Sequence, residues 1–240
     1  MNAAVPMPHR FEVSAIAFDL DGTLLDTIHD LAAALNALLA ELGRPPLPTD
    51  AVRALVGKGM ANLVRRALAL SAGPACELPN DAEQDRALAR YQTFYAAQLG
   101  RATTPFPGLV GCLDGLRAEG FALALVTNKA TRFVRPHLQH AGIADRFDLV
   151  IGGDDLPVKK PDAGPLLHAA AAFGIAPARL LMVGDSANDV LAARAAGCPV
   201  LVVPHGYREG ARVQDLGADG IVSSLAAVVD RVLHIAPDLI

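Results

Sequence analysis

Residues 15–24 read Ala-Ile-Ala-Phe-Asp-Leu-Asp-Gly-Thr-Leu, and this stretch decides the fold. The apolar residues from Ile16 to Leu20 are typical of a buried β-strand, and Asp19 and Asp21 stand where that strand should end. Ligands of open α/β sheets bind at the carboxyl ends of the strands. Two carboxylates this close on one side of a strand resist joint ionisation unless a cation joins them. The stretch therefore predicts a metal site or an acid–base pair, although Asp-Gly alone is equally typical of a plain turn.

Beyond residue 105, short apolar runs alternate with helical segments of about ten to fifteen residues. Such alternation predicts a parallel sheet with helices on both faces. A further helix is expected after the last strand. Together with the first strand, the expected strands are 121–126, 148–151, 180–183, 199–203 and 220–223. The predicted fold class is α/β, with a Rossmann-like parallel sheet core.

The first strand and the strand expected at 121–126 lie about a hundred residues apart in the sequence, whereas the connection between two parallel strands needs only about a dozen residues. The intervening segment carries apolar stripes at helical spacing, and it is too regular for a disordered loop. We therefore expect an all-helical domain inserted into the α/β core. The predicted domains are residues 27–104, which are helical, and residues 1–26 with 105–240, which form the core.

Composition and charge exclude several classes of protein. The chain has 240 residues, 52% of them hydrophobic, and a formal net charge of −4 without a long basic run, so nucleic acid and anionic membranes are not expected partners. The first twelve residues lack an apolar signal core, and no uncharged apolar stretch reaches the roughly 18 residues that a membrane helix needs. Cys76, Cys112 and Cys198 are too far apart for a metal motif. We expect a cytoplasmic protein.

Polar side chains follow four of the expected strands, and the carboxyl ends of parallel strands share one edge of the sheet. Three carboxylates at this edge, those of Asp19, Asp21 and Asp185, are hard oxygen ligands suited to Mg²⁺, which keeps waters and shares its shell with phosphate. A lysine and a threonine hydroxyl there can bind phosphoryl oxygens. The candidates are Asp19 and Asp21, Thr127 with Asn128, Lys160, and Asp185 with Asp189. This set indicates phosphoryl transfer.

The ordered set Asp-x-Asp-Gly-Thr, strand-end Thr, Lys-Pro and Gly-Asp-Ser-x-x-Asp resembles the motifs of the haloacid dehalogenase superfamily of aspartate-based phosphatases. The resemblance runs from the first strand to about Val203. It implies that Asp19 is the nucleophile that forms an aspartyl-phosphate. It also implies that Asp21 protonates the leaving group and then activates water, and that Thr127 and Lys160 bind the phosphoryl group.

The same resemblance implies a magnesium site made by Asp185, the Asp19 carboxylate and the main-chain carbonyl of Asp21, with Asp189 holding a metal-bound water. It further implies that residues 27–104 are a cap that closes over the site and selects the substrate. An acid at position 21 favours phosphate esters over haloacids, because a halide leaves without a proton.

Further segments resemble bacterial phosphoglycolate phosphatases, with one departure, since Asp162 stands where the Lys-Pro motif often has a second proline. The matching segments are 126–129, 133–134, 150–155, 159–161, 184–189, 195–198 and 205–207. This resemblance implies hydrolysis of 2-phosphoglycolate, a small-molecule phosphomonoester. We expect a monomer or a homodimer.

Three alternatives stay open at this point. The substrate could be another small phosphomonoester, such as a sugar phosphate or N-acetylmuramic acid 6-phosphate. The protein could be a phosphomutase of the β-phosphoglucomutase type. A non-enzymatic phospho-acceptor signalling module also gathers acidic residues, a threonine and a lysine at one sheet edge, but the inserted helices and the motif order argue against it.

Residues outside these motifs have weaker interpretations. Gly57-Lys58-Gly59 precedes a helix and could bind an anion such as the glycolate carboxylate, although a plain helix break is at least as well supported. Asp154 and Asp155 are expected as turn residues, with a place near the metal as a secondary possibility. His137 and His140 are expected on an exposed helix surface.

Overall fold

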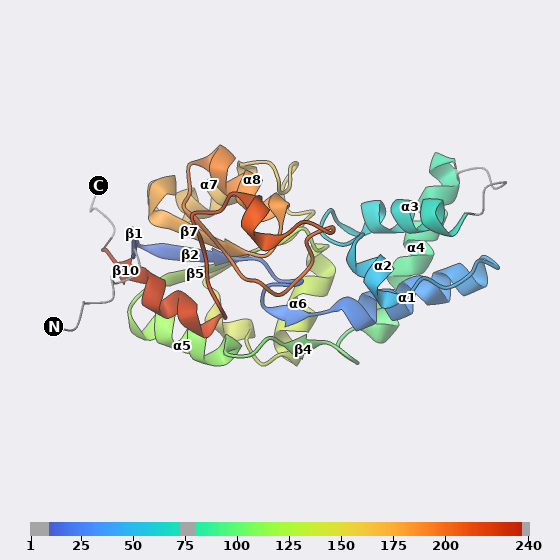
Figure 1. Cartoon of the computed structure of the whole chain (residues 1–240), viewed down its shortest axis with the longest axis horizontal. Coiled ribbons are helices and arrows are strands. Elements are labelled where there is room, and N and C mark those ends of the chain that lie inside the picture. The colour runs from blue at the N-terminus through green and yellow to red at the C-terminus, as the bar shows by residue number, and fades with distance from the viewer. Residues whose placement is uncertain (1–9, 73–79, 237–240) are drawn as a thin grey trace.

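The computed structural model describes residues 10–72 and 80–236, so Cys76 and most of the N-terminal segment lie outside the described residues. A six-stranded sheet with the order β6-β5-β2-β7-β8-β9 forms the centre, and every neighbouring pair is parallel (Figure 1). Its strands are β2 (Ala15–Phe18), β5 (Ala122–Val126), β6 (Leu149–Ile151), β7 (Leu180–Gly184), β8 (Val200–Val202) and β9 (Gly220–Ile221). The predicted parallel α/β core is thus confirmed.

Helices cover both faces of this sheet. Alternate residues of β2 point to opposite faces, so Ile16 and Phe18 pack on one side and Ala15 and Ala17 on the other. The first side is covered by α5 (Leu109–Ala118) and α6 (Thr131–His140), and the second by α7 (Gly164–Ala172) and α8 (Ala187–Ala196). Burial of these apolar side chains on both faces is the main force that holds the sheet in place.

The end of the described chain corrects one prediction. Instead of the expected C-terminal helix, residues 226–231 form the short 3₁₀ helix η4 (Ala226–Arg231), and β10 (Val232–His234) follows. β10 pairs in parallel with β1 (Phe11–Val13). The 3₁₀ helix buries Val228 against the core and β10 buries Val232, so these apolar residues reach the core without an α-helix.

In the described part of the chain, four helices stand between β3 (Leu25–Asp26) and β4 (Thr104–Pro105), which pair antiparallel, so the chain enters and leaves this helical block side by side. The helices lie at the end of the molecule opposite β1 and β10 (Figure 1) and share a hydrophobic cluster of their own, which also receives Phe133 and Tyr207. They are α1 (Ile28–Glu41), α2 (Thr49–Arg53), α3 (Met60–Ser71) and α4 (Asp81–Gln98). A capping box between Asn80 and Glu83 starts α4.

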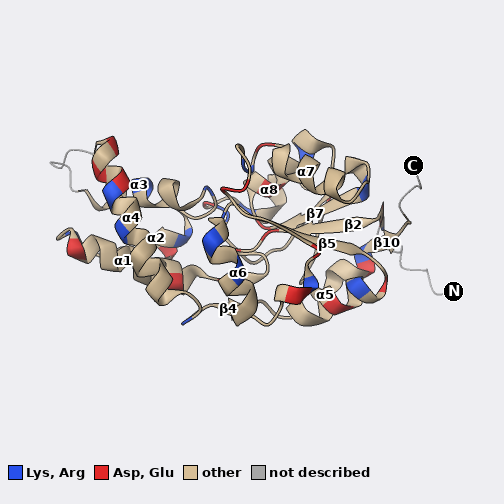
Figure 2. Ribbon diagram, turned by 180° about the vertical axis from the view of Figure 1, so that it is seen from behind, with Lys and Arg blue, Asp and Glu red and all other residues tan. Residues whose placement is uncertain are grey.

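Both acidic and basic residues occur in the helical block and in the core (Figure 2). Within the described ranges, no helix combines the length and the apolar character that crossing a bilayer requires. Cys112 and Cys198 are buried free thiols.

Candidate active site

A cavity lies at the carboxyl edge of the sheet, between the strand ends and the helical block. The ends of β2, β5 and β7 bring Asp19, Thr127 and Asp185 to this edge although they are far apart in sequence. The core contributes Asp19, Asp21, Thr127, Asn128, Lys129, Lys160, Ser186, Asn188 and Asp189 to the lining. The helical block contributes Leu31, Val56, Gly57, Gly59, Met60 and Leu63. The cavity is therefore polar on the sheet side and largely apolar on the helical side.

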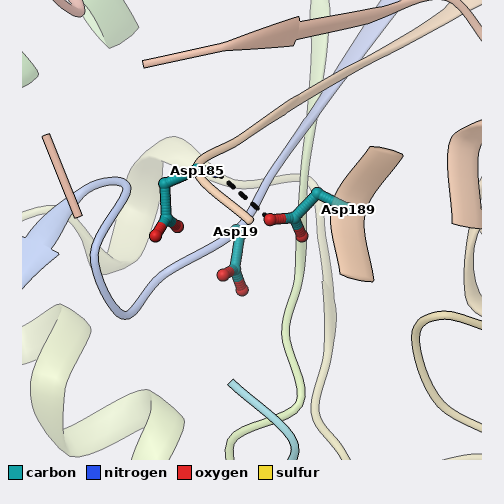
Figure 3. A group of neighbouring side chains, drawn as sticks. All are labelled: Asp19, Asp185 and Asp189. Carbon is teal, nitrogen blue, oxygen red and sulfur yellow. Dashed lines mark hydrogen bonds between the residues drawn. The ribbon is translucent and has the colours of Figure 1, made fainter. Parts of the chain in front are cut away.

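Three carboxylates form a compact group at this edge. Asp19, Asp185 and Asp189 each offer an oxygen, and these oxygens lie within 4.8 Å of one another (Figure 3). Asp185 is held firmly, because the Thr23 hydroxyl donates to its Oδ1 at 2.6 Å and the Tyr207 backbone N–H donates to its Oδ2 at 2.6 Å. The group has the donor chemistry that a hard divalent cation requires.

The raised pKa values of two of these carboxylates also favour a bound cation. Burial raises the pKa of Asp19 to about 6; the negative charge of Asp189 adds to this rise and Lys160 opposes it. Burial likewise raises the pKa of Asp185 well above its usual range, and the charges of Asp189 and Asp19 add to the effect. Buried carboxylates that disfavour joint ionisation become compatible when a cation neutralises them. The residues present therefore fit a divalent metal ion.

Two glycines allow loops to close over Asp185. Gly22 has φ +90°, and a Cβ added there would lie 2.7 Å from Asp185 Oδ2. Gly206 has φ +110°, and a Cβ there would lie 2.4 Å from the same oxygen. A side chain at either position would strain the backbone and displace the carboxylate, so both positions require glycine.

Lys160 lies between two carboxylates, with its side chain 2% exposed. Its Nζ is 3.0 Å from Asp19 Oδ1 and 2.6 Å from Asp189 Oδ1, and it donates to the Val126 carbonyl at 2.7 Å. Burial alone would lower the pKa of Lys160, but Asp189 and Asp19 raise it, so the ammonium stays charged. The other oxygen of Asp189 accepts from the N–H of Asp185 at 3.2 Å and of Ser186 at 3.0 Å. Both oxygens of Asp189 are thus engaged by protein donors.

Asp21 has surroundings of a different kind. Lys129 Nζ lies 2.9 Å from its Oδ1 and 3.0 Å from its Oδ2, and the Thr27 hydroxyl donates to Oδ1 at 2.8 Å. Burial opposes ionisation, yet the Lys129 charge lowers the pKa of Asp21. The two acidic residues of the opening motif, Asp19 and Asp21, therefore differ in partners and in pKa, which suits them to different chemical roles.

Three functional candidates were missed by sequence reasoning. Lys129 is buried, and its Nζ donates to the Tyr95 hydroxyl at 2.6 Å. Tyr95 comes from α4 and lies 2.9 Å from His137 Nε2. The expectation that His137 is exposed was wrong: it is fully buried, because the face of α6 that carries it packs toward α4. Two signals were available: Lys129 lies two residues after Thr127 at the same strand end, and His137 lies at helical spacing from Phe133 on the apolar face of α6.

Of the other predicted binding residues, Thr127 and Asn128 line the cavity and Lys58 does not. The Asn128 side-chain amide donates to the carbonyls of Gly57 at 2.9 Å and Lys160 at 2.8 Å, which joins the core to the α2–α3 loop. Lys58, in that loop, does not line the cavity, and its Nζ lies 3.1 Å from a carboxylate oxygen of Glu209. Thr127 lines the cavity, and its hydroxyl accepts from the Lys129 N–H at 3.2 Å.

The two acidic residues after β6 hydrogen-bond within the turn and to the start of α6. Asp154 accepts from the Thr131 N–H at 2.6 Å, at the first residue of α6. Asp155 accepts from the Gly152 N–H at 2.7 Å. Neither belongs to the group of three carboxylates.

Comparison with known proteins gives one family. A model of haloacid dehalogenase-like hydrolases matches residues 13–197. Phosphoglycolate phosphatases from Thiobacillus denitrificans and Nitrosospira multiformis are 45% and 47% identical to the chain; each alignment covers 92% of the chain and 94% of the relative. The crystal structure of a "predicted phosphoglycolate phosphatase" from Haemophilus somnus superposes with a TM-score of 0.87 at 32% identity, over 90% of this chain and 96% of that one.

Proposed function

The chain belongs to the haloacid dehalogenase-like hydrolases, and from this premise we propose that it hydrolyses 2-phosphoglycolate to glycolate and phosphate. Relatives that bear the name phosphoglycolate phosphatase are similar over nearly the whole chain, helical block included. The observation that carries the chemistry is the contrast between Asp19, which faces Lys160 and two further carboxylates, and Asp21, which faces Lys129. This contrast supports the proposal that Asp19 attacks phosphorus and that Asp21 moves a proton.

In the proposed reaction, an Asp19 oxygen forms a bond to phosphorus while the bond to the glycolate oxygen breaks. Asp21 gives its proton to that oxygen, so glycolate leaves as an alcohol. Asp21 then takes a proton from water, and the water oxygen attacks the aspartyl-phosphate to release phosphate and regenerate Asp19. Lys160 lowers the repulsion between the Asp19 carboxylate and the phosphate dianion. Thr127 is proposed to bind the phosphoryl oxygens with Lys160.

We propose that the metal is Mg²⁺, held by the carboxylates of Asp19 and Asp185 and the main-chain carbonyl of Asp21. The full engagement of Asp189 by protein donors supports its proposed place outside these ligands. When bound, the ion would neutralise negative charge on the phosphoryl oxygens and the carboxylates. The metal assignment is tested by chelation, as described below.

We propose that residues 27–104 act as a cap domain that covers the site and selects the substrate, because α1 and α3 supply much of the apolar lining. Two proposed binding residues must change partners to act. Asn128 must release one of the two carbonyls that its amide holds before it can bind phosphate. Lys58 must leave Glu209 before it can bind the substrate carboxylate. A cytoplasmic location and a monomeric or homodimeric state remain predictions.

A substrate panel tests the proposed function. The specificity constant kcat/KM should be at least about tenfold higher for 2-phosphoglycolate than for glucose phosphates, N-acetylmuramic acid 6-phosphate and pyrophosphate, the margin that about 1.4 kcal/mol of preferred binding gives. A sugar phosphate as the best substrate would contradict it. An isomerised sugar phosphate as product would indicate a phosphomutase. Phosphate release that stops after one turnover would indicate a phospho-acceptor module.

A further inference from the structure

A buried chain of polar groups runs from Asp21 into the helical block. The Lys129 side chain is 1% exposed, and its Nζ contacts both oxygens of Asp21 and the hydroxyl of Tyr95. The Tyr95 hydroxyl in turn lies 2.9 Å from His137 Nε2. These groups come from the loop after β2, the loop after β5, α4 and α6. The series of hydrogen-bonded side chains therefore crosses from the core to the cap and back.

The direction of each hydrogen bond follows from the donors available. An ammonium can only donate, so the Tyr95 oxygen accepts from Lys129. The one proton of the Tyr95 hydroxyl is then free to donate to His137 Nε2, and this arrangement puts the proton of the neutral ring on Nδ1. Burial, and next the positive charge of Lys129, lower the pKa of His137 to about 4, which keeps the ring neutral at physiological pH. His137 therefore fixes the Tyr95 hydroxyl, and Tyr95 fixes the ammonium.

The contacts of Lys129 argue against a direct role in substrate binding. An ammonium has three N–H groups, and Lys129 has three oxygen partners: two on Asp21 and one on Tyr95. No N–H group of Lys129 is left for a substrate carboxylate while these three hydrogen bonds are intact. Asp21 keeps one oxygen on Lys129 when the other oxygen carries the proton for the leaving group. The ion pair in the structure is the state that Asp21 reaches after it has given that proton away.

We propose that Lys129 is a positioning residue for Asp21, and that Tyr95 of the cap holds the Lys129 ammonium in place. The inference rests on the proposed function, in which Asp21 protonates the leaving group. It adds a residue of the cap to the machinery of proton transfer, since Tyr95 acts on Asp21 through Lys129. The geometry that carries it is the twofold contact of one buried lysine with the acid.

The test compares kcat/KM of Lys129→Met on three substrates, because this constant covers only the steps up to the first phosphoryl transfer. Ethyl phosphate and 2-phosphoglycolate have leaving groups that need a proton, whereas 4-nitrophenyl phosphate does not. We expect kcat/KM to fall about 100-fold for the first two, the range that general acid catalysis contributes, and less than about fivefold for the third.

Tyr95→Phe gives a second, milder test that removes a single oxygen. We expect kcat/KM to fall about tenfold for the two alkyl phosphates and to change little for 4-nitrophenyl phosphate. Tyr91→Phe is the matched control: Tyr91 is also fully buried in α4 and stacks on Tyr95, but its hydroxyl has no hydrogen-bond partner in the described part of the chain. This control should leave all three rates unchanged. If Lys129→Met does not fold, Tyr95→Phe decides the matter.

The outcomes separate this inference from the proposed function. Asp21→Asn should itself show the loss that depends on the leaving group; if it does not, the acid role of Asp21 fails. If Asp21→Asn shows it but Lys129→Met and Tyr95→Phe lose equal activity on all three substrates, the positioning role is wrong. A loss confined to 2-phosphoglycolate would also overturn it, because Lys129 would then bind the substrate carboxylate.

Discussion

Lys160 Nζ lies 3.0 Å from Asp19 Oδ1, and the same ammonium is shared with Asp189. Because the lysine is buried, Lys160→Met would leave two carboxylates without their cation. We expect a loss of about 3 kcal/mol in the free energy of unfolding of the metal-free protein, measured by urea titration, since removing one partner of a buried pair leaves an uncompensated charge. The double variant with Asp189→Asn should recover part of this loss. A loss below about 1 kcal/mol would show that Lys160 does not neutralise the group.

The raised pKa of Asp19 makes stability depend on pH. Its pKa is about 6 in the folded protein against an ordinary value of 3.8, so the folded state binds the proton more tightly. Ionised Asp19 therefore costs stability above pH 6, and this cost disappears as the pH falls toward 4. We compare the free energies of unfolding of Asp19→Asn and the parent, both treated with chelator. The change caused by the substitution should be about 2 to 3 kcal/mol more stabilising at pH 8 than at pH 4. An equal effect at both pH values would contradict the shift.

Removal of the metal tests the group of three carboxylates. A chelator should stop phosphate release, and added Mg²⁺ should restore it. Mg²⁺ should also raise the Tm of the parent protein, because an ion that binds only the folded state stabilises it. Asp185→Asn should lose this rise in Tm. Activity that persists with the chelator would remove the metal from the reaction.

Lys58 is tested by comparing substrates with and without a carboxylate. Lys58→Ala should raise KM for 2-phosphoglycolate about tenfold, roughly the value of one charge-assisted hydrogen bond, and should change KM for 4-nitrophenyl phosphate little. Glu209→Gln frees Lys58 from its ion pair and should not raise KM for 2-phosphoglycolate. Equal increases for both substrates in Lys58→Ala would leave Lys58 as part of a plain break between helices.

Much of the fold followed from local patterns in the sequence. Strand-length apolar runs alternating with helices predicted the parallel sheet, because both faces of such a sheet are buried. The pairing of β1 with β10 could not be predicted, since these strands are three residues long and lie at opposite ends of the chain. The final helix was predicted in error, because Val228 and Val232 are buried by a 3₁₀ turn and a strand instead.

The site, like the fold, could be predicted from the sequence only in part. Asp19, Thr127 and Asp185 could be grouped from sequence, because the ends of parallel strands share one edge of a sheet. The contacts of Tyr95 and His137 depend on how the inserted helices pack on α6, and no periodic pattern encodes a contact between separate elements. Its spacing from Phe133 and Val134 places His137 on the apolar face of α6, so its burial could have been predicted from the sequence, whereas its contact with Tyr95 of α4 could not.

The proposed mechanism requires that Asp19 becomes phosphorylated during each turnover. Enzyme mixed with ³²P-labelled 2-phosphoglycolate, quenched rapidly in acid and digested, should yield one labelled peptide, containing Asp19, whose label is released by hydroxylamine. Asp19→Asn should give no label and no turnover while keeping the circular dichroism spectrum of the parent. Label on another residue, or turnover by Asp19→Asn above about a thousandth of the parent rate, would contradict the account.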